Sequence, residues 1–253
     1  MSVLRTFART VLPRPAHRVL KATYQRYVLN HAVRQLAGAI SREDDLPAGL
    51  WSDLVYGWGN DYAAYPEYLK TVLRHAQNVD GPILEYGSGL STLLLGLVAD
   101  KRGLEVWSLE HIPVWAEKIH TELKSWWITN VHLCAARLQD YGTYVWYHFP
   151  WECLPTDFSL VVCDGPPADT PGGRYGLVPV MRSRLKAGCT ILLDDANRAP
   201  ERAILARWAQ DLETTPSVFA SDAASKSNKR YATLIVPEVA NTEVRQGTRE
   251  ESM

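Results

Sequence analysis

The first 42 residues contain no aspartate or glutamate, although they hold eight arginines and lysines. Across all 253 residues the net charge is only −1, so we expect no nucleic-acid partner. No apolar run reaches the roughly 18–20 residues that a membrane-spanning helix needs, and the amino terminus lacks the continuous apolar core of a secretory signal. These absences predict a soluble protein with one basic end.

Cysteine is also scarce, because the chain has 4 and none of them forms a C-x-x-C pair. Cys163 and Cys189 lie within apolar runs, where a small buried thiol is the simplest interpretation. We therefore expect no disulfide framework and a reducing, cytoplasmic location.

The rest of the composition is that of a globular domain, with 46% hydrophobic and 22% charged residues. The length fits one α/β domain with additions. We expect a basic helical extension over residues 1–48, a main domain over 49–237 and a polar, disordered tail over 238–253.

The basic extension has the pattern of an amphipathic helix that is broken at Pro13 and Pro15. Either it packs on the main domain and exposes its basic face, or residues 1–40 lie on an anionic membrane surface. A polar hinge from Glu43 to Pro47 would follow it. The predicted apolar side consists of Val19, Leu20, Tyr24, Tyr27, Val28 and Leu36.

In the main domain, apolar runs alternate with helical patterns, which predicts a Rossmann-like parallel sheet with helices on both faces. Two further strands, near 216–220 and 230–236, would close the sheet as an antiparallel pair. The parallel strands are expected near 82–86, 104–109, 130–134, 158–163 and 189–193, and the helices near 66–77, 91–99, 113–125, 175–185 and 200–212.

The stretch from Gly81 to Leu95 reads as a short buried strand, a glycine turn and the start of a helix. Gly87 and Gly89 permit a tight turn, and the helix behind it points free N–H groups at whatever lies above the sheet. The strand also contains Glu85. Because a buried carboxylate is costly without a partner, this acid needs a functional explanation.

Carboxylates stand at four of the five predicted parallel strand ends, which is where open α/β sheets bind ligands. Any one of them could be a helix cap or turn former, but the whole set favours a site. Glu110 follows Gly89 by 21 residues, about the spacing at which an acid meets the ribose hydroxyls of a nucleotide-like cofactor. The strand-end acids are Glu85, Glu110, Asp164, Asp194 and Asp195.

The segment from Leu84 to Leu93, followed by Glu110, resembles the cofactor motifs of class I S-adenosylmethionine-dependent methyltransferases. The resemblance covers roughly residues 80–212 and implies S-adenosyl-L-methionine as cofactor, with Glu85 near its methionine end and Glu110 on its ribose. A dinucleotide site is disfavoured because Thr92 replaces the third glycine of G-x-G-x-x-G. The implied cofactor residues are Glu85, Gly87, Ser88, Gly89, Ser91, Thr92, Glu110, His111, Ala136 and Arg137.

Asp164-Gly165-Pro166, Gly173-Arg174 and Asp194-Asp195 are similar in order and spacing to metal-assisted O-methyltransferases of the catechol and glucuronoxylan types. The resemblance implies that Asp164, Asp194 and Asp195 hold magnesium or manganese. Such an ion would favour the alkoxide of a substrate hydroxyl. The match departs at Pro167, where the catechol type has its catalytic lysine.

Without a metal, Asp164 or His148 would act as general base. Arg174 would bind an anionic substrate group or support the acids. His148 lies in an aromatic segment over residues 144–151. Its Trp146 and Trp151 either pack the sheet edge or form a wall for a sugar or another ring, with Trp58 and the Gly57–Gly59 turn closing the opposite side.

The sequence thus predicts an O-methyltransferase, with divalent-metal assistance, that acts on a saccharide or glycolipid-like hydroxyl. One alternative is a metal-independent methyltransferase of a small aromatic metabolite. Another is a non-catalytic cofactor-binding module that docks through its basic amino terminus, and an oxidoreductase is the weakest. The expected partner is a small-molecule or glycan acceptor, and self-association as a homo-oligomer stays open.

Overall fold

The structure is a computed structural model that describes residues 14–42, 46–47, 49–60, 62–220 and 228–238. Pro13, most of the predicted hinge and all but the first residue of the predicted tail lie outside the described residues. None of the described helices is long and apolar enough to cross a membrane.

A seven-stranded sheet forms the centre of the molecule, in the order β3-β2-β1-β6-β7-β9-β8. The first five of these are parallel, whereas β9 runs antiparallel to both of its neighbours. This confirms the expected fold class. The strands are β1 (Ile83–Tyr86), β2 (Val106–Glu110), β3 (Val131–Ala135), β6 (Phe158–Cys163), β7 (Leu185–Leu193), β8 (Ser217–Ala220) and β9 (Arg230–Ile235).

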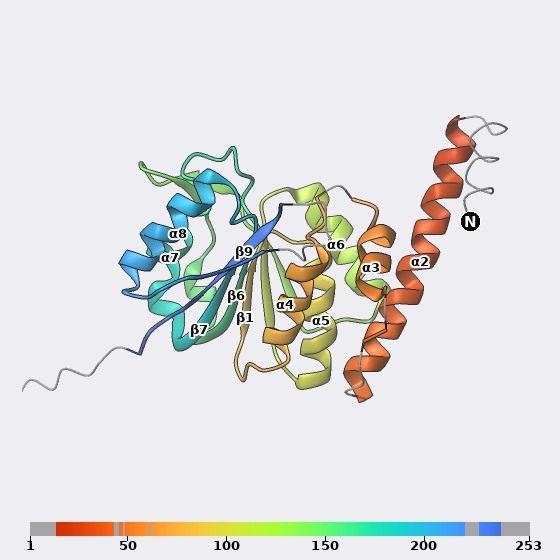
Figure 1. The fold of residues 1–253 in the computed structure, drawn as a ribbon, viewed down its shortest axis with the longest axis horizontal. Helices are drawn as coiled ribbons and strands as arrows, with labels where there is room; N and C mark the ends of the chain where they lie inside the picture. The colour runs from red at the N-terminus through yellow and green to blue at the C-terminus, as the bar shows by residue number, and fades with distance from the viewer. Residues whose placement is uncertain (1–13, 43–45, 48, 61, 221–227, 239–253) are drawn as a thin grey trace, which may run out of the picture.

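Helices cover both faces of this sheet (Figure 1). One face carries α4 (Pro66–Ala76), α5 (Leu90–Arg102) and α6 (Pro113–Ser125), and the other carries α7 (Leu177–Met181), the short η2 (Arg182–Arg184) and α8 (Ala199–Asp211). Successive strand residues point to opposite faces, so Ile83 joins the core under α4 and α5 while Leu84 joins the core under α7 and α8.

The amino-terminal helix α2 (Arg14–Arg42) is continuous, because Pro15 sits in its first turn, where its missing N–H is not needed. The half from Leu29 to Ile40 packs on α3 (Leu50–Trp58) and α5. Gly57 lies inside α3 rather than in a turn. A Cβ there would lie 2.6 Å from the backbone nitrogen of Leu29, so α2 and α3 cross too closely for a side chain. The predicted apolar side was wrong in part, since Val19, Leu20, Tyr24 and Tyr27 are exposed.

An antiparallel hairpin that the sequence did not predict, β4 (Leu138–Asp140) and β5 (Val145–Tyr147), contains the first part of the aromatic segment. The short helix η1 (Trp151–Cys153) follows it. Trp146 is fully buried, with its ring centroid 4.8 Å from that of Tyr86. It is therefore a packing residue and not a wall for a substrate. Trp58, the last residue of α3, likewise packs against the core rather than closing a site.

Candidate cofactor and active site

The turn between β1 and α5 is shaped by two glycines with different tasks. Gly87 has a positive φ of 86°, and a Cβ there would lie 2.8 Å from the backbone nitrogen of Gly165. Only glycine fits both restraints without strain. At Gly89, in contrast, a Cβ would meet no atom of the described residues within 4 Å. The space above Gly89 is therefore open to a ligand.

Glu85 lies fully buried beneath this turn. Its Oε2 accepts hydrogen bonds of 2.6 Å from the hydroxyls of Thr92 and Ser108. Thr92 in turn accepts a bond from the Gly89 N–H at 2.8 Å, so a chain of hydrogen bonds ties the turn to the acid. Among the described residues Oε1 has no hydrogen-bond partner.

The electrostatic state of Glu85 follows from this setting. Burial raises its pKa to about 7, although the hydroxyls of Ser108, Ser91 and Thr92 act in the opposite direction. A buried carboxylate with a raised pKa is stabilised in its ionised form when a cation approaches it. The site therefore favours a ligand with a positive group near Glu85.

Glu110, at the end of β2, approaches the same turn from the other side. Its Oε2 accepts hydrogen bonds from the backbone N–H (3.0 Å) and the hydroxyl (2.9 Å) of Ser88, and its Oε1 accepts one from the Ile112 N–H at 2.9 Å. Burial opposes ionisation, but the contacts with His111, Ile112 and Ser88 outweigh it and hold the pKa of Glu110 below its usual range. An ionised acceptor thus stands beside the glycine turn.

The remaining residues predicted near the cofactor are less tightly placed. Ala136 is buried, and its N–H donates to the backbone carbonyl of Glu110 at 2.8 Å. Arg137 is exposed and contributes its carbonyl to the His148 N–H. The His148 ring lies 3.4 Å from the hydroxyl of Tyr141, so the contacts of this histidine stay beside the hairpin. They give no geometric support to a role as general base.

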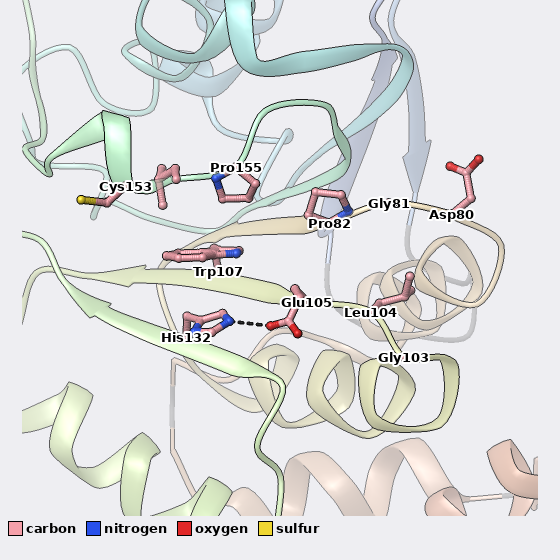
Figure 2. Close-up of a pocket in the computed structure, with 11 residues that line it drawn as sticks. Asp80, Gly81, Pro82, Gly103, Leu104, Glu105, Trp107, His132, Cys153 and Pro155 are labelled. Carbon is pink, nitrogen blue, oxygen red and sulfur yellow. Dashed lines mark hydrogen bonds and ion pairs between the residues drawn. The ribbon is translucent and has the colours of Figure 1, made fainter.

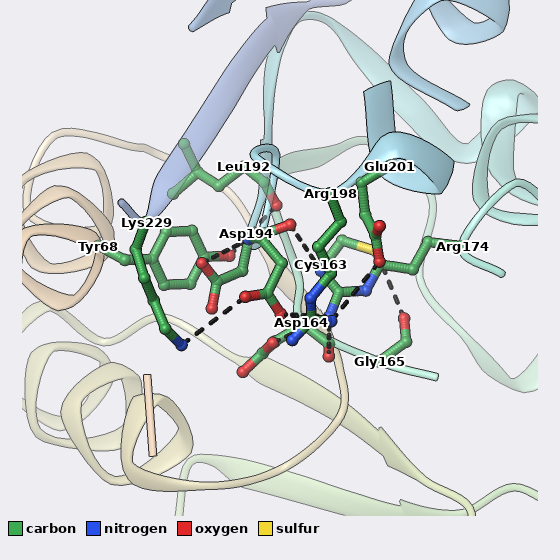
Figure 3. Close-up of polar contacts among 11 residues, drawn as sticks. Tyr68, Cys163, Asp164, Gly165, Arg174, Leu192, Asp194, Arg198, Glu201 and Lys229 are labelled. Atoms are coloured by element: carbon green, nitrogen blue, oxygen red, sulfur yellow. Dashed lines mark hydrogen bonds and ion pairs between the residues drawn. The ribbon is translucent and has the colours of Figure 1, made fainter. Parts of the chain in front are cut away.

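Three acids gather at the ends of β6 and β7, as predicted. Asp164, Asp194 and Asp195 each place an oxygen within 4.8 Å of the others (Figure 3). Arg174 is 2% exposed and donates hydrogen bonds of 2.7 Å to the backbone carbonyls of Asp164 and Asp194. It also lies 3.1 Å from the Asp164 carboxylate and 3.4 Å from that of Asp195. Arg174 therefore ties two strand ends together.

Two further cations, Arg198 and Lys229, reach this cluster. The sequence alone predicted no role for them. Nη1 of Arg198 lies 2.9 Å from Asp195 Oδ2, and Nζ of Lys229 lies 3.7 Å from Asp195 Oδ1. Burial and mutual repulsion nevertheless raise the pKa of Asp164 to about 6 and hold that of Asp194 well above its usual range. Burial is the largest cause of both shifts, and the cluster holds three acids and three cations side by side.

A cavity of about 700 Å³ lies elsewhere, at the amino ends of β1 and β2 (Figure 2). The rings of Trp107 and His132 stack there with centroids 4.3 Å apart, and His132 contacts Glu105. Because β1 and β2 carry Glu85 and Glu110 near their opposite, carboxyl ends, this cavity is separate from the acids described above.

Comparison with known proteins shows the fold but no close relative. No family model matches the chain, and no curated protein matches it. A precorrin-6Y C5,15-methyltransferase from Geobacter metallireducens aligns over 71% of this chain and 92% of its own, with 17% identity and a TM-score of 0.53. An O-methyltransferase from Bacillus cereus, in complex with SAH, aligns over 93% and 97%, with 13% identity and a TM-score of 0.52. The chain thus shares its fold with methyltransferases.

Proposed function

We propose that this chain is an S-adenosylmethionine-dependent methyltransferase. The observation that carries the proposal is that two acids flank one glycine turn, one with a raised pKa and the other with a lowered pKa. Glu85 offers a buried oxygen that has no hydrogen-bond partner in the described part of the chain, and Glu110 offers an ionised acceptor beside Ser88. A ligand with a positive group at one end and a pair of hydroxyls at the other satisfies both. S-adenosylmethionine has this composition, and the Bacillus cereus neighbour holds SAH on the same fold.

Each residue then has a separable task. Gly89 would let the cofactor approach the backbone. Glu110 would accept hydrogen bonds from the ribose hydroxyls of the cofactor, and Glu85 would compensate the positive charge of the methionine end of the cofactor. When bound, the cofactor supplies an electrophilic methyl group on a sulfonium. The protein has to hold that methyl in line with an acceptor and to keep the acceptor nucleophilic.

We place the acceptor hydroxyl at the cluster of Asp164, Asp194 and Asp195, which lies beyond the ends of the neighbouring strands. The donor chemistry of three carboxylates fits magnesium or manganese, and these acids would hold the ion. An alternative without metal is also open, because Arg174, Arg198 and Lys229 already stand beside the acids. In that case Asp164 is the candidate base. Methylation of a hydroxyl on a saccharide or glycolipid-like acceptor rests on the sequence resemblance alone, since Trp146 is buried.

The cofactor assignment is tested by calorimetry with S-adenosylhomocysteine. We expect a single site, and absence of binding would contradict the proposal. Transfer of a labelled methyl group to fractionated cell glycans and to small aromatic metabolites then tests the acceptor. Binding without turnover on any acceptor would favour a non-catalytic cofactor-binding module.

The metal is tested separately, by assaying the purified protein after exhaustive chelation and after adding back magnesium or manganese. If the acids hold a catalytic ion, chelation abolishes turnover, the ion restores it, and Asp194→Asn stays inactive under both conditions. Full activity of the chelated protein would assign the role to a metal-free base.

A further inference from the structure

Trp115, a half-buried residue near the start of α6, reaches the glycine turn between β1 and α5. Its indole Nε1–H donates a hydrogen bond of 2.8 Å to the backbone carbonyl of Ser88. The ring packs against the core, and the ammonium of Lys118 lies 4.5 Å from its centroid. A cation over the face of an indole ring stabilises the position of that ring. The N–H of Trp115 is therefore held where it meets the turn.

The peptide bond between Ser88 and Gly89 is held at both of its polar atoms. Trp115 binds its carbonyl oxygen, and the hydroxyl of Thr92 accepts a hydrogen bond of 2.8 Å from its N–H. The Thr92 hydroxyl in turn donates to Glu85. Because the C=O and N–H of a trans peptide point in opposite directions, α6 and α5 hold this peptide plane from opposite sides.

The preceding peptide, between Gly87 and Ser88, is held by Glu110. The N–H and the hydroxyl of Ser88 both donate to Glu110 Oε2. Both donors of Ser88 and its carbonyl thus have partners within residues 110–115. Since β2 ends at Glu110 and α6 begins at Pro113, one short segment carries both the acid and the tryptophan that hold the turn.

Glycine makes this support necessary. A residue without a Cβ changes its φ over a wide range at little cost, so the Ser88–Gly89 peptide rotates easily on its Gly89 side unless its polar atoms are held. Rotation would break the bond from the Gly89 N–H to Thr92 and move the backbone beside the open space above Gly89. The bond from Trp115 opposes this rotation at the carbonyl oxygen.

We propose that Trp115 is a positioning residue of the cofactor site, whose indole N–H fixes the Ser88–Gly89 peptide in the orientation that S-adenosylmethionine requires. This inference rests on the proposed function, because it assigns the space above Gly89 to that cofactor. Trp115 does not touch the reacting atoms. Without its hydrogen bond, the cofactor has to order the turn when it binds, and its affinity falls accordingly.

Two substitutions separate the N–H of Trp115 from the packing of its ring. Trp115→Phe keeps an aromatic ring without a donor. Trp115→His keeps less of the ring but retains a donor, because Nε2 of an imidazole corresponds to the indole nitrogen. The dissociation constant for S-adenosylhomocysteine, measured by calorimetry, should rise about 2- to 12-fold in Trp115→Phe, the equivalent of one neutral hydrogen bond. It should rise less in Trp115→His. Weaker binding by Trp115→His than by Trp115→Phe would overturn the inference, because packing alone gives that order.

The matched control is Trp126→Phe, which should bind S-adenosylhomocysteine as the unmodified protein does. Trp126 directly follows α6, packs against the same core and donates its indole N–H to Glu122 at 3.2 Å. Trp115→Phe and Trp126→Phe therefore lose a similar bond at opposite ends of one helix. Binding by Trp115→Phe that equals the control would also overturn the inference.

Hydrogen–deuterium exchange of the unliganded protein tests the same contact without a cofactor. Residues 87–92 should exchange faster in Trp115→Phe than in Trp126→Phe, while β7 exchanges equally in both. Equal exchange in the turn overturns the inference whether or not S-adenosylhomocysteine binds. Faster exchange in a protein that does not bind S-adenosylhomocysteine would support the contact and contradict the proposed function. Circular dichroism verifies folding, and Trp115→Leu replaces Trp115→Phe if that variant does not fold.

Discussion

Replacing Glu110 with glutamine is the most direct test of the cofactor site. The carboxylate already accepts hydrogen bonds from Ser88 and Ile112, which uses three of its roughly four acceptor positions. Two ribose hydroxyls can both be accepted if the Ser88 hydroxyl rotates away. Glutamine keeps one acceptor oxygen and turns the other into a donor, so one charge-assisted hydrogen bond to the ribose is lost.

The expected magnitude follows from that lost bond. A hydrogen bond to a charged group contributes about 1.5–3 kcal/mol, so the dissociation constant for S-adenosylhomocysteine should rise about 10- to 150-fold. Calorimetry at fixed pH and salt measures it. Glu105→Gln is the matched control, because Glu105 immediately precedes the same strand, its side chain is 54% exposed, and its ion-pair partner is His132. It should bind the cofactor product normally.

A 2′-deoxy analogue of S-adenosylhomocysteine separates ligand contact from loop support. If Glu110 touches the ribose, the deoxy analogue binds the unmodified protein weakly, and Glu110→Gln weakens it little further. If the variant loses the same factor with both ligands, Glu110 acts only by holding Ser88, and its assignment to the ribose is wrong.

Three further outcomes follow from the glycine turn and the acid beneath it. Gly89→Ala should leave the free energy of unfolding within about 0.5 kcal/mol of the original. It should weaken S-adenosylhomocysteine binding, because the added Cβ would enter space that is open in the structure. Normal binding would contradict the cofactor placement. Gly87→Ala should destabilise the protein by about 2 kcal/mol or more in urea titrations, owing to its positive φ and its contact with Gly165. The pKa of Glu85 is raised in the folded state from 4.5 to about 7, so the folded protein binds a proton more tightly than the unfolded chain. The contribution of Glu85 to the free energy of unfolding should therefore fall by about 3 kcal/mol as pH rises from 4.5 to 7. A Glu85→Gln variant whose pH profile still matched the original would refute this.

The positions of the strand-end acids could be predicted because apolar runs mark strands, and parallel strands end on one edge of a sheet. The cations around Asp195 were harder to predict. Lys229 reaches it because β9 begins at the edge where β7 ends, and only the antiparallel pairing brings the two together. Periodicity also could not tell which apolar residues of α2 the domain covers: Leu29, Val33 and Leu36 are buried, whereas Val19, Leu20 and Tyr27 are exposed. Nor could it tell that Trp146 would be enclosed, because sequence position does not specify which aromatic residues a hairpin buries.

The segment from Asp164 to Arg174, after β6, is fixed at both ends, and this affects how its acceptor specificity could change. Asp164 and Arg174 are linked to each other and to the end of β7, whereas residues 167–169 and 171–172 between them are exposed. Insertions or replacements in that exposed stretch would alter the surroundings of an acceptor without moving the acids. A loop that is held at both ends can be replaced, by evolution or by design, to change acceptor specificity while the geometry of methyl transfer is preserved.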